Sequence, residues 1–142
     1  MMFDLFKKKE DLKKDDNSLL KVASLLIHVA KVDEEYTSKE KEIIKQAIIE
    51  LGVEKEVINQ FITRAEELET NSNQILDFTK EIKLFDNNYK VKIIEVLWKI
   101  IFSNNEEDMY ESNLMRRLSG LMYLDKKLVA DIKDRIKKNL GK

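Results

Sequence analysis

The chain has 142 residues, of which 43% are hydrophobic and 37% are charged, and its 26 basic and 27 acidic side chains nearly cancel. This combination excludes an intrinsically disordered chain and allows one domain with a substantial core. The lack of cysteine excludes disulfides, thiolate metal sites and a cysteine nucleophile, and no apolar run reaches the roughly 18 residues of a membrane-spanning helix. We therefore expect a soluble, cytoplasmic protein without a secretory signal. With no proline and three glycines, it is expected to consist of helices with short connections.

The N-terminal residues 1–16 stand outside the regular pattern and are predicted to form an arm ahead of one helical domain at residues 17–142. The arm begins with a short apolar tip at residues 1–6, which three lysines follow. Two interpretations of the arm stay open. One is a poorly ordered terminus, and the other is a weak contact with a membrane surface or a partner.

Apolar residues recur at helical spacing along the rest of the chain. The predicted helices cover residues 18–31, 38–51, 54–69, 73–84, 89–102, 109–123 and 126–139. The third is expected to bury Val57. The fifth is apolar on nearly all sides, so it is predicted to be the central helix, with Trp98 packed in the core. Gly52 is expected to end the second helix in a left-handed conformation, and Gly120 to allow close packing of helices.

The sequence repeats itself 71 residues apart without a gap, and apolar positions align with apolar positions throughout. The polar positions of the turns align as Asp33 with Asn104, Glu35 with Glu106, and Glu40 with Glu111. Such a period predicts two copies of one helical unit, at about residues 18–69 and 89–140. We therefore predict an all-α, single-domain bundle of about seven helices, built from two pseudo-two-fold three-helix repeats.

The first copy contains Ser24-Leu25-Leu26-Ile27-His28-Val29-Ala30-Lys31-Val32-Asp33, an acidic turn, Glu40, and a helix ending in Leu51-Gly52-Val53. The second copy contains Leu97-Trp98-Lys99-Ile100 before its turn, then Tyr110-Glu111 and Leu114-Met115-Arg116-Arg117-Leu118. In this pattern the chain resembles the tellurite-resistance TerB family over roughly residues 18–140.

The resemblance implies a compact, all-helical cytoplasmic module with an acidic site that has been suggested to bind divalent cations. It also implies a link to tellurite resistance and general stress, often beside membrane partners, and no established enzymatic activity. The family's turns usually read Asp-Gly in both copies, whereas this chain has Asp33-Glu34 and Asn104-Asn105. The second turn therefore lacks the charge of its first aspartate.

The two acidic turns are the candidate site, because carboxylate oxygens are the ligands that Ca²⁺ and Mg²⁺ prefer. The residues predicted to hold a divalent cation are Asp33, Glu35, Glu40, Asn104, Glu106 and Glu111. A second interpretation needs no metal. Thr37 and Glu40 have the spacing of a capping box, and Asp108 and Glu111 have the same spacing at the second turn. Both interpretations stay open at this point.

We therefore expect a non-enzymatic module that binds a divalent cation or a protein partner, including a membrane-associated one, through its acidic turns. An enzyme has little support, because the chain lacks a glycine-rich phosphate loop and pairs no serine with its only histidine, His28, which is expected at the surface. The first alternative is a metal-independent protein-interaction adaptor. The second is binding of nucleic acid or an anionic membrane surface through the basic residues in 116–138. Interleaved aspartates favour a solvated helix face there.

Overall fold

The computed structural model describes residues 17–31, 36–72, 76–103 and 109–141. The predicted arm at residues 1–16 lies outside them. The elements are an N-terminal helix at residues 17–30, α2 (Ser38–Leu51), a short 3₁₀ turn η1 (Lys55–Val57), α3 (Ile58–Asn71), α4 (Leu76–Ile82), α5 (Asn87–Ser103), α6 (Met109–Leu121) and α7 (Lys126–Asn139). The described residues contain no strand, so the predicted all-α fold class is confirmed.

Two of the predicted helices differ from those observed by more than two residues at one end. The third begins at Ile58 instead of residue 54, because the backbone of Glu54 is extended and the residues after it form the 3₁₀ turn. Val57 therefore lies ahead of the helix and is 43% exposed, so the prediction that it is buried was wrong. The fourth helix, predicted over 73–84, is the short α4, and its first predicted residues lie outside the described part of the chain.

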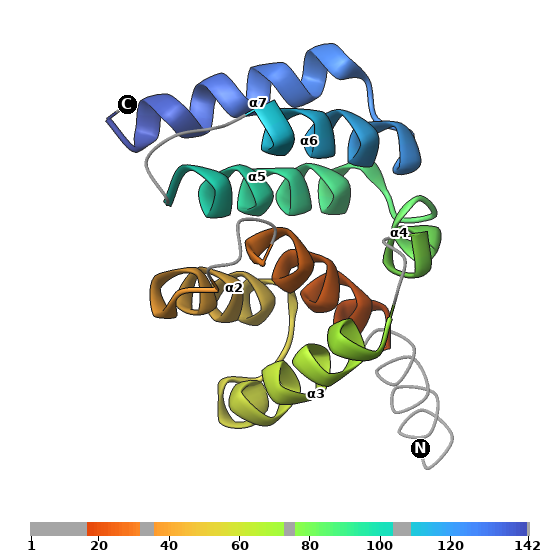
Figure 1. Cartoon of the computed structure of the whole chain (residues 1–142), viewed down its shortest axis with the longest axis vertical. Coiled ribbons are helices and arrows are strands. Elements are labelled where there is room, and N and C mark those ends of the chain that lie inside the picture. The colour runs from red at the N-terminus through yellow and green to blue at the C-terminus, as the bar shows by residue number, and fades with distance from the viewer. Residues whose placement is uncertain (1–16, 32–35, 73–75, 104–108, 142) are drawn as a thin grey trace, which may run out of the picture.

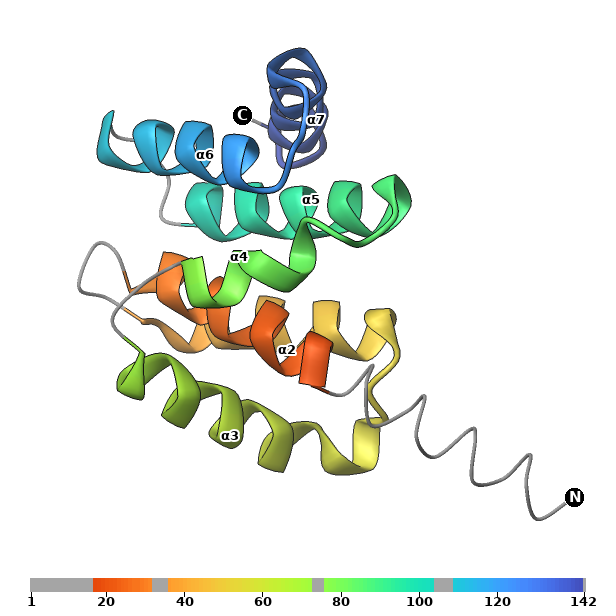
Figure 2. The ribbon, with the colours of Figure 1, turned by 90° about the vertical axis from the view of Figure 1, so that its right-hand side faces the viewer.

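Helix α5 lies at the centre of the fold (Figures 1 and 2). It contacts α2 on one side and α7 on the other, while α4 packs against α6. Its buried residues are Lys90, Ile93, Ile94, Val96, Leu97, Trp98, Ile100, Ile101 and Phe102. A helix that buries most of its circumference must have neighbours on several sides, so the predicted central position of this helix is confirmed.

Polar contacts link the helices around this core. The hydroxyl of Ser24 in the N-terminal helix donates to the carbonyl of Ala65 in α3 at 3.2 Å. The Tyr89 hydroxyl at the start of α5 donates to the carbonyl of Leu51, the last residue of α2, at 3.0 Å. Both contacts form only when the helices are packed in this way, so they favour this arrangement over sliding alternatives.

The ends of α2 and α6 share one pattern of hydrogen bonds, 71 residues apart. At the end of α2, the amide of Gly52 donates to the carbonyl of Ile49, and the amide of Val53 donates to the carbonyl of Ile48. At the end of α6, the amides of Tyr123 and Leu124 donate to the carbonyls of Gly120 and Ser119, which are the corresponding positions. Both Gly52 and Tyr123 have positive φ angles, as residues that close such a helix end require. The predicted left-handed helix end at Gly52 is confirmed. The larger prediction, two three-helix repeats at residues 18–69 and 89–140, stays a prediction.

Gly120 does not have the predicted role. It is exposed near the end of α6, and a Cβ built on it would meet no atom of the described residues within 4 Å. Because none of the described helices comes that close to it, the prediction that Gly120 allows tight helix packing was wrong.

Candidate functional site

Glu40 lies in the first turn of α2 and forms the predicted capping box with Thr37. Its Oε1 accepts hydrogen bonds from the Thr37 backbone amide at 2.8 Å and from the Thr37 hydroxyl at 3.0 Å. The Glu40 amide in turn donates to the Thr37 hydroxyl at 3.1 Å. The side chain is fully buried, with 0% exposure. The capping interpretation of Glu40 is therefore confirmed, and it places a carboxylate inside the protein directly after the first acidic turn.

Glu111 has the corresponding place in the second half of the chain. It lies in the first turn of α6 and is 5% exposed. Charged side chains are seldom buried to this degree unless they are paired, hydrogen-bonded or bound to a metal. Two buried glutamates at the beginnings of two helices, each after an acidic turn, therefore form the best-defined part of the predicted site.

The other four predicted cation ligands, Asp33, Glu35, Asn104 and Glu106, lie outside the residues that the structure describes. Asp108, the predicted cap of α6, lies outside them too. Within the described residues, no group of three or more histidine, aspartate or glutamate side chains is arranged to hold a metal ion. The assembly of the six predicted residues into one site therefore stays a prediction.

Two glutamates of α3 near the first turn were missed by the sequence analysis. Glu69 Oε1 lies 2.7 Å from Lys31 Nζ, and Glu69 Oε2 lies 3.3 Å from His28 Nδ1. Glu66 Oε2 lies 3.3 Å from Lys41 Nζ in α2. These pairs join the N-terminal helix, α2 and α3, and we call the carboxylates and cations that form them the paired-charge cluster. The sequence contains one indication of this cluster. Glu66 and Glu69 are three residues apart, and residues with that spacing share a face of a helix.

His28 was expected at the surface, but its exposure to solvent is intermediate. Its side chain is 37% exposed, while that of its partner Glu69 is only 11% exposed. The imidazole therefore lies at the edge of the cluster, with one nitrogen directed to a carboxylate. This arrangement gives His28 a structural role in the packing of the N-terminal helix on α3.

Tyr36 lies beside the same carboxylates, immediately before α2. Its hydroxyl oxygen is buried, and no hydrogen bond to it from the described residues has acceptable geometry. Burial raises the pKa of Tyr36 well above its usual range, and the neighbouring carboxylate of Glu66 and the charges of Glu40 and Glu69 act in the same direction. The phenol therefore stays neutral to a higher pH than an exposed tyrosine does.

None of the helices formed by the described residues is both long enough and apolar enough to span a membrane.

Comparison with known proteins bears on the family. The model of the family described as "Tellurite resistance protein TerB" matches residues 19–134. A search of curated proteins and a search of solved structures found no match. The matched segment extends from the N-terminal helix into α7, so it includes both acidic turns and both buried glutamates. The resemblance inferred from the two repeated motifs is therefore confirmed, and the chain belongs to the TerB family.

Proposed function

We propose that this chain is a non-enzymatic TerB module that binds a divalent cation, Ca²⁺ or Mg²⁺, at its acidic turns. The observation that supports the proposal is the burial of Glu40 and Glu111 at matching positions, each directly after a turn rich in carboxylates. In the proposed site, these two glutamates are the inner ligands, and the outer ligands are Asp33, Glu35, Asn104 and Glu106.

Capping and cation binding are compatible for Glu40. Both Thr37 hydrogen bonds reach the same oxygen, Oε1. A carboxylate has about four lone-pair positions on its two oxygens, so it can accept these bonds and still coordinate a cation. Calcium sites use this versatility, because Ca²⁺ takes six to eight oxygen ligands in flexible geometry. The capping box would then hold the carboxylate in place before the cation arrives.

In this proposal, cation binding serves a role in tellurite or general stress resistance. A bound cation neutralises the acidic turns and orders them, which alters the surface that a protein partner meets. As the family resemblance implies, a membrane-associated protein is a candidate for that partner.

A metal-independent adaptor is the second candidate, and the paired-charge cluster favours it. Glu66 and Glu69 already have lysine and histidine partners at 2.7–3.3 Å, so they need no cation. Glu40 likewise has its capping bonds. In this alternative, the acidic turns recognise a basic surface on a partner protein directly.

Thermal melting of EDTA-treated protein, titrated with Ca²⁺ or Mg²⁺ at constant ionic strength, tests the proposal. A ligand that binds the native state raises the melting temperature. We expect a saturable rise at sub-millimolar ion, which Glu40→Gln and Glu111→Gln abolish. Glu67→Gln is the control, because Glu67 is exposed on α3.

Glutamine preserves a capping box, so Glu40→Gln in the metal-free protein should cost less than about 1 kcal/mol. No rise with either ion in the unmodified protein contradicts cation binding. The adaptor is then supported if a captured protein partner binds equally well in EDTA, and if combining Glu40→Gln with Glu111→Gln weakens that binding.

A further inference from the structure

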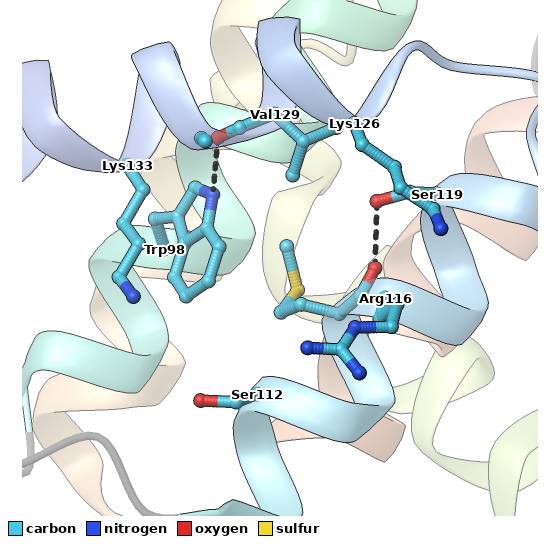
Figure 3. A pocket seen from close by; sticks show the side chains of 9 residues that line it. Trp98, Ser112, Arg116, Ser119, Lys126, Val129 and Lys133 are labelled. Carbon is cyan, nitrogen blue, oxygen red and sulfur yellow. Dashed lines mark hydrogen bonds between the residues drawn. The ribbon is translucent and has the colours of Figure 1, made fainter.

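A hollow of about 350 Å³ opens between α5, α6 and α7 (Figure 3). Its floor includes Trp98 of α5, and its sides carry Arg116 of α6 with Lys126 and Lys133 of α7. The volume lies at the lower end of the range for small-molecule sites. Neither the fold nor the proposed cation site requires this hollow.

The described side chains that line the hollow carry charge of only one sign. Three cationic side chains line it, and no carboxylate of the described residues does. Arg116 and Lys126 form no ion pair within the described part of the chain, whereas Arg135, further along α7, pairs with Glu95 at 2.7 Å. Cations that line one concave surface repel one another, so an anion that enters the hollow is stabilised by their charge.

The floor of the hollow is firmly packed. Trp98 is 3% exposed, donates from Nε1 to the Val129 carbonyl at 3.3 Å, and stacks on Phe102 with ring centroids 5.7 Å apart. The ammonium of Lys133 lies 5.3 Å from the centre of the indole ring. These contacts hold the aromatic wall and one cation in a defined relation, as a preorganised site requires.

We propose that this hollow binds a small organic phosphate, in which a phosphate monoester group meets Arg116 while Lys126 and Lys133 add positive charge from the two sides of the hollow. The planar guanidinium of arginine matches the oxygens of phosphate in a bidentate manner, and the two ammonium groups supply further charge. The apolar wall formed by Trp98, Met115 and Val129 suits an aromatic or aliphatic group attached to the phosphate. Soluble phosphate esters and the headgroup of phosphatidic acid share this chemistry.

The sequence offers a direct readout, because Trp98 is the only tryptophan. An anion that draws the Lys133 ammonium changes the electric field at the indole, so the fluorescence of Trp98 should respond. We would titrate the full chain with phenyl phosphate at constant ionic strength and use phenol as the uncharged control. The expected result is a saturable change in fluorescence with phenyl phosphate and none with phenol.

Matched variants separate this site from the general basic surface. Arg116→Gln and Lys126→Gln remove cations that line the hollow, and each should weaken binding about tenfold or more. Arg117→Gln and Lys127→Gln remove the same charges one residue further along, at exposed positions that do not line it. These controls should change the dissociation constant by less than about threefold, and all four variants should melt like the unmodified protein.

A second arm distinguishes the sources of the phosphate. If vesicles containing phosphatidic acid bind the protein, with the same dependence on Arg116 and Lys126, while phenyl phosphate does not, the ligand is the lipid headgroup. The absence of saturable binding to both probes overturns the proposal. Equal losses in the Arg116 and Arg117 variants also overturn it. So does binding to duplex DNA that all four variants weaken alike, because a diffuse basic face then explains the charge.

Discussion

The paired-charge cluster and the hollow between α5, α6 and α7 lie in different halves of the chain. Charged side chains are paired in the cluster, whereas two of the cations in the hollow have no ion pair among the described residues. In the cluster, Glu66 and Glu69 each contact a cationic partner from another helix. In the hollow, Arg116 and Lys126 both line the surface, and neither forms an ion pair with another described residue. The total charge of −1 hides this separation. Similar numbers of charges thus join helices in one half and offer a site for an anion in the other.

This difference has a thermodynamic reason. A charge pair between helices favours the folded arrangement over any in which the helices separate, provided that the carboxylate is partly shielded from water. Arg116 and Lys126, which form no ion pair among the described residues, add little to stability, and their charges cost some self-repulsion. Residues of the cluster should therefore affect folding, and the cations around the hollow should affect binding.

The largest effect is expected from the wall between the hollow and the core. Trp98→Ala should destabilise the protein by about 3–5 kcal/mol, because it removes a buried ring and its hydrogen bond. Trp98→Phe keeps most of the volume and should cost about 1–2 kcal/mol. Denaturant unfolding followed by circular dichroism measures both. A cost below about 1.5 kcal/mol for Trp98→Ala would show that packing does not support the hollow.

The difference between the two regions is tested most directly by comparing how variants of Glu69 and Arg116 change the free energy of unfolding. Glu69→Ala leaves Lys31 and His28 without their shared carboxylate and should cost about 1–2 kcal/mol, less at high salt. Arg116→Ala should change stability by less than about 0.5 kcal/mol. Glu67→Ala is the control on the same helix. Equal costs for Glu69→Ala and Glu67→Ala in urea unfolding would remove the distinction between the two regions.

Substitutions at the ends of α2 and α6 should change the stability of the protein in opposite directions. Gly52 has φ of +129°, so Gly52→Ala should cost about 1 kcal/mol even though space for a Cβ exists. Tyr123 has φ of +57° at the matching position, so Tyr123→Gly should gain about 0.5 kcal/mol. Thermal unfolding measures both changes. A loss of stability in Tyr123→Gly would assign a stabilising role to its exposed ring, which lies 5.8 Å from the Lys83 ammonium.

The smallest effect at neutral pH is expected from Tyr36, and it should grow with pH. Tyr36→Phe removes a buried hydroxyl that has no hydrogen bond of acceptable geometry among the described residues, so stability should change by less than about 0.5 kcal/mol at pH 7. The raised pKa of Tyr36 favours the neutral phenol in the folded state, so its contribution is complete below the usual tyrosine pKa of about 10 and is lost above it.

Urea unfolding between neutral pH and about pH 11 tests this. The unmodified protein should lose stability above about pH 10 more steeply than Tyr36→Phe does. Tyr123→Phe is the control, since that ring is exposed. Identical slopes for the unmodified protein and Tyr36→Phe would mean that the phenol is not held in its neutral form.

Local structure followed from the sequence where residues near each other in the chain decide it. The boundaries of α2 and α7 match the predicted ranges, because a capping residue precedes each: Thr37 for α2 and Asp125 for α7. The 3₁₀ turn ahead of α3 was missed, since no cap at Glu54 distinguishes it from the first turn of an α-helix. The capping box at Glu40 needed only a spacing of three residues.

The sequence by itself therefore determined the helical class, the family, the central helix and the cap at Glu40, all of which depend on periodicity or on neighbours within one turn. Only the tertiary structure decided that Glu69 reaches Lys31 across 38 positions, and that Arg116 shares a hollow with Lys126 and Lys133. Whether a charge is paired or left to a ligand depends on how whole helices pack. That packing is determined by the shapes of the buried apolar faces of the helices. It does not depend on the charged side chains on their exposed faces.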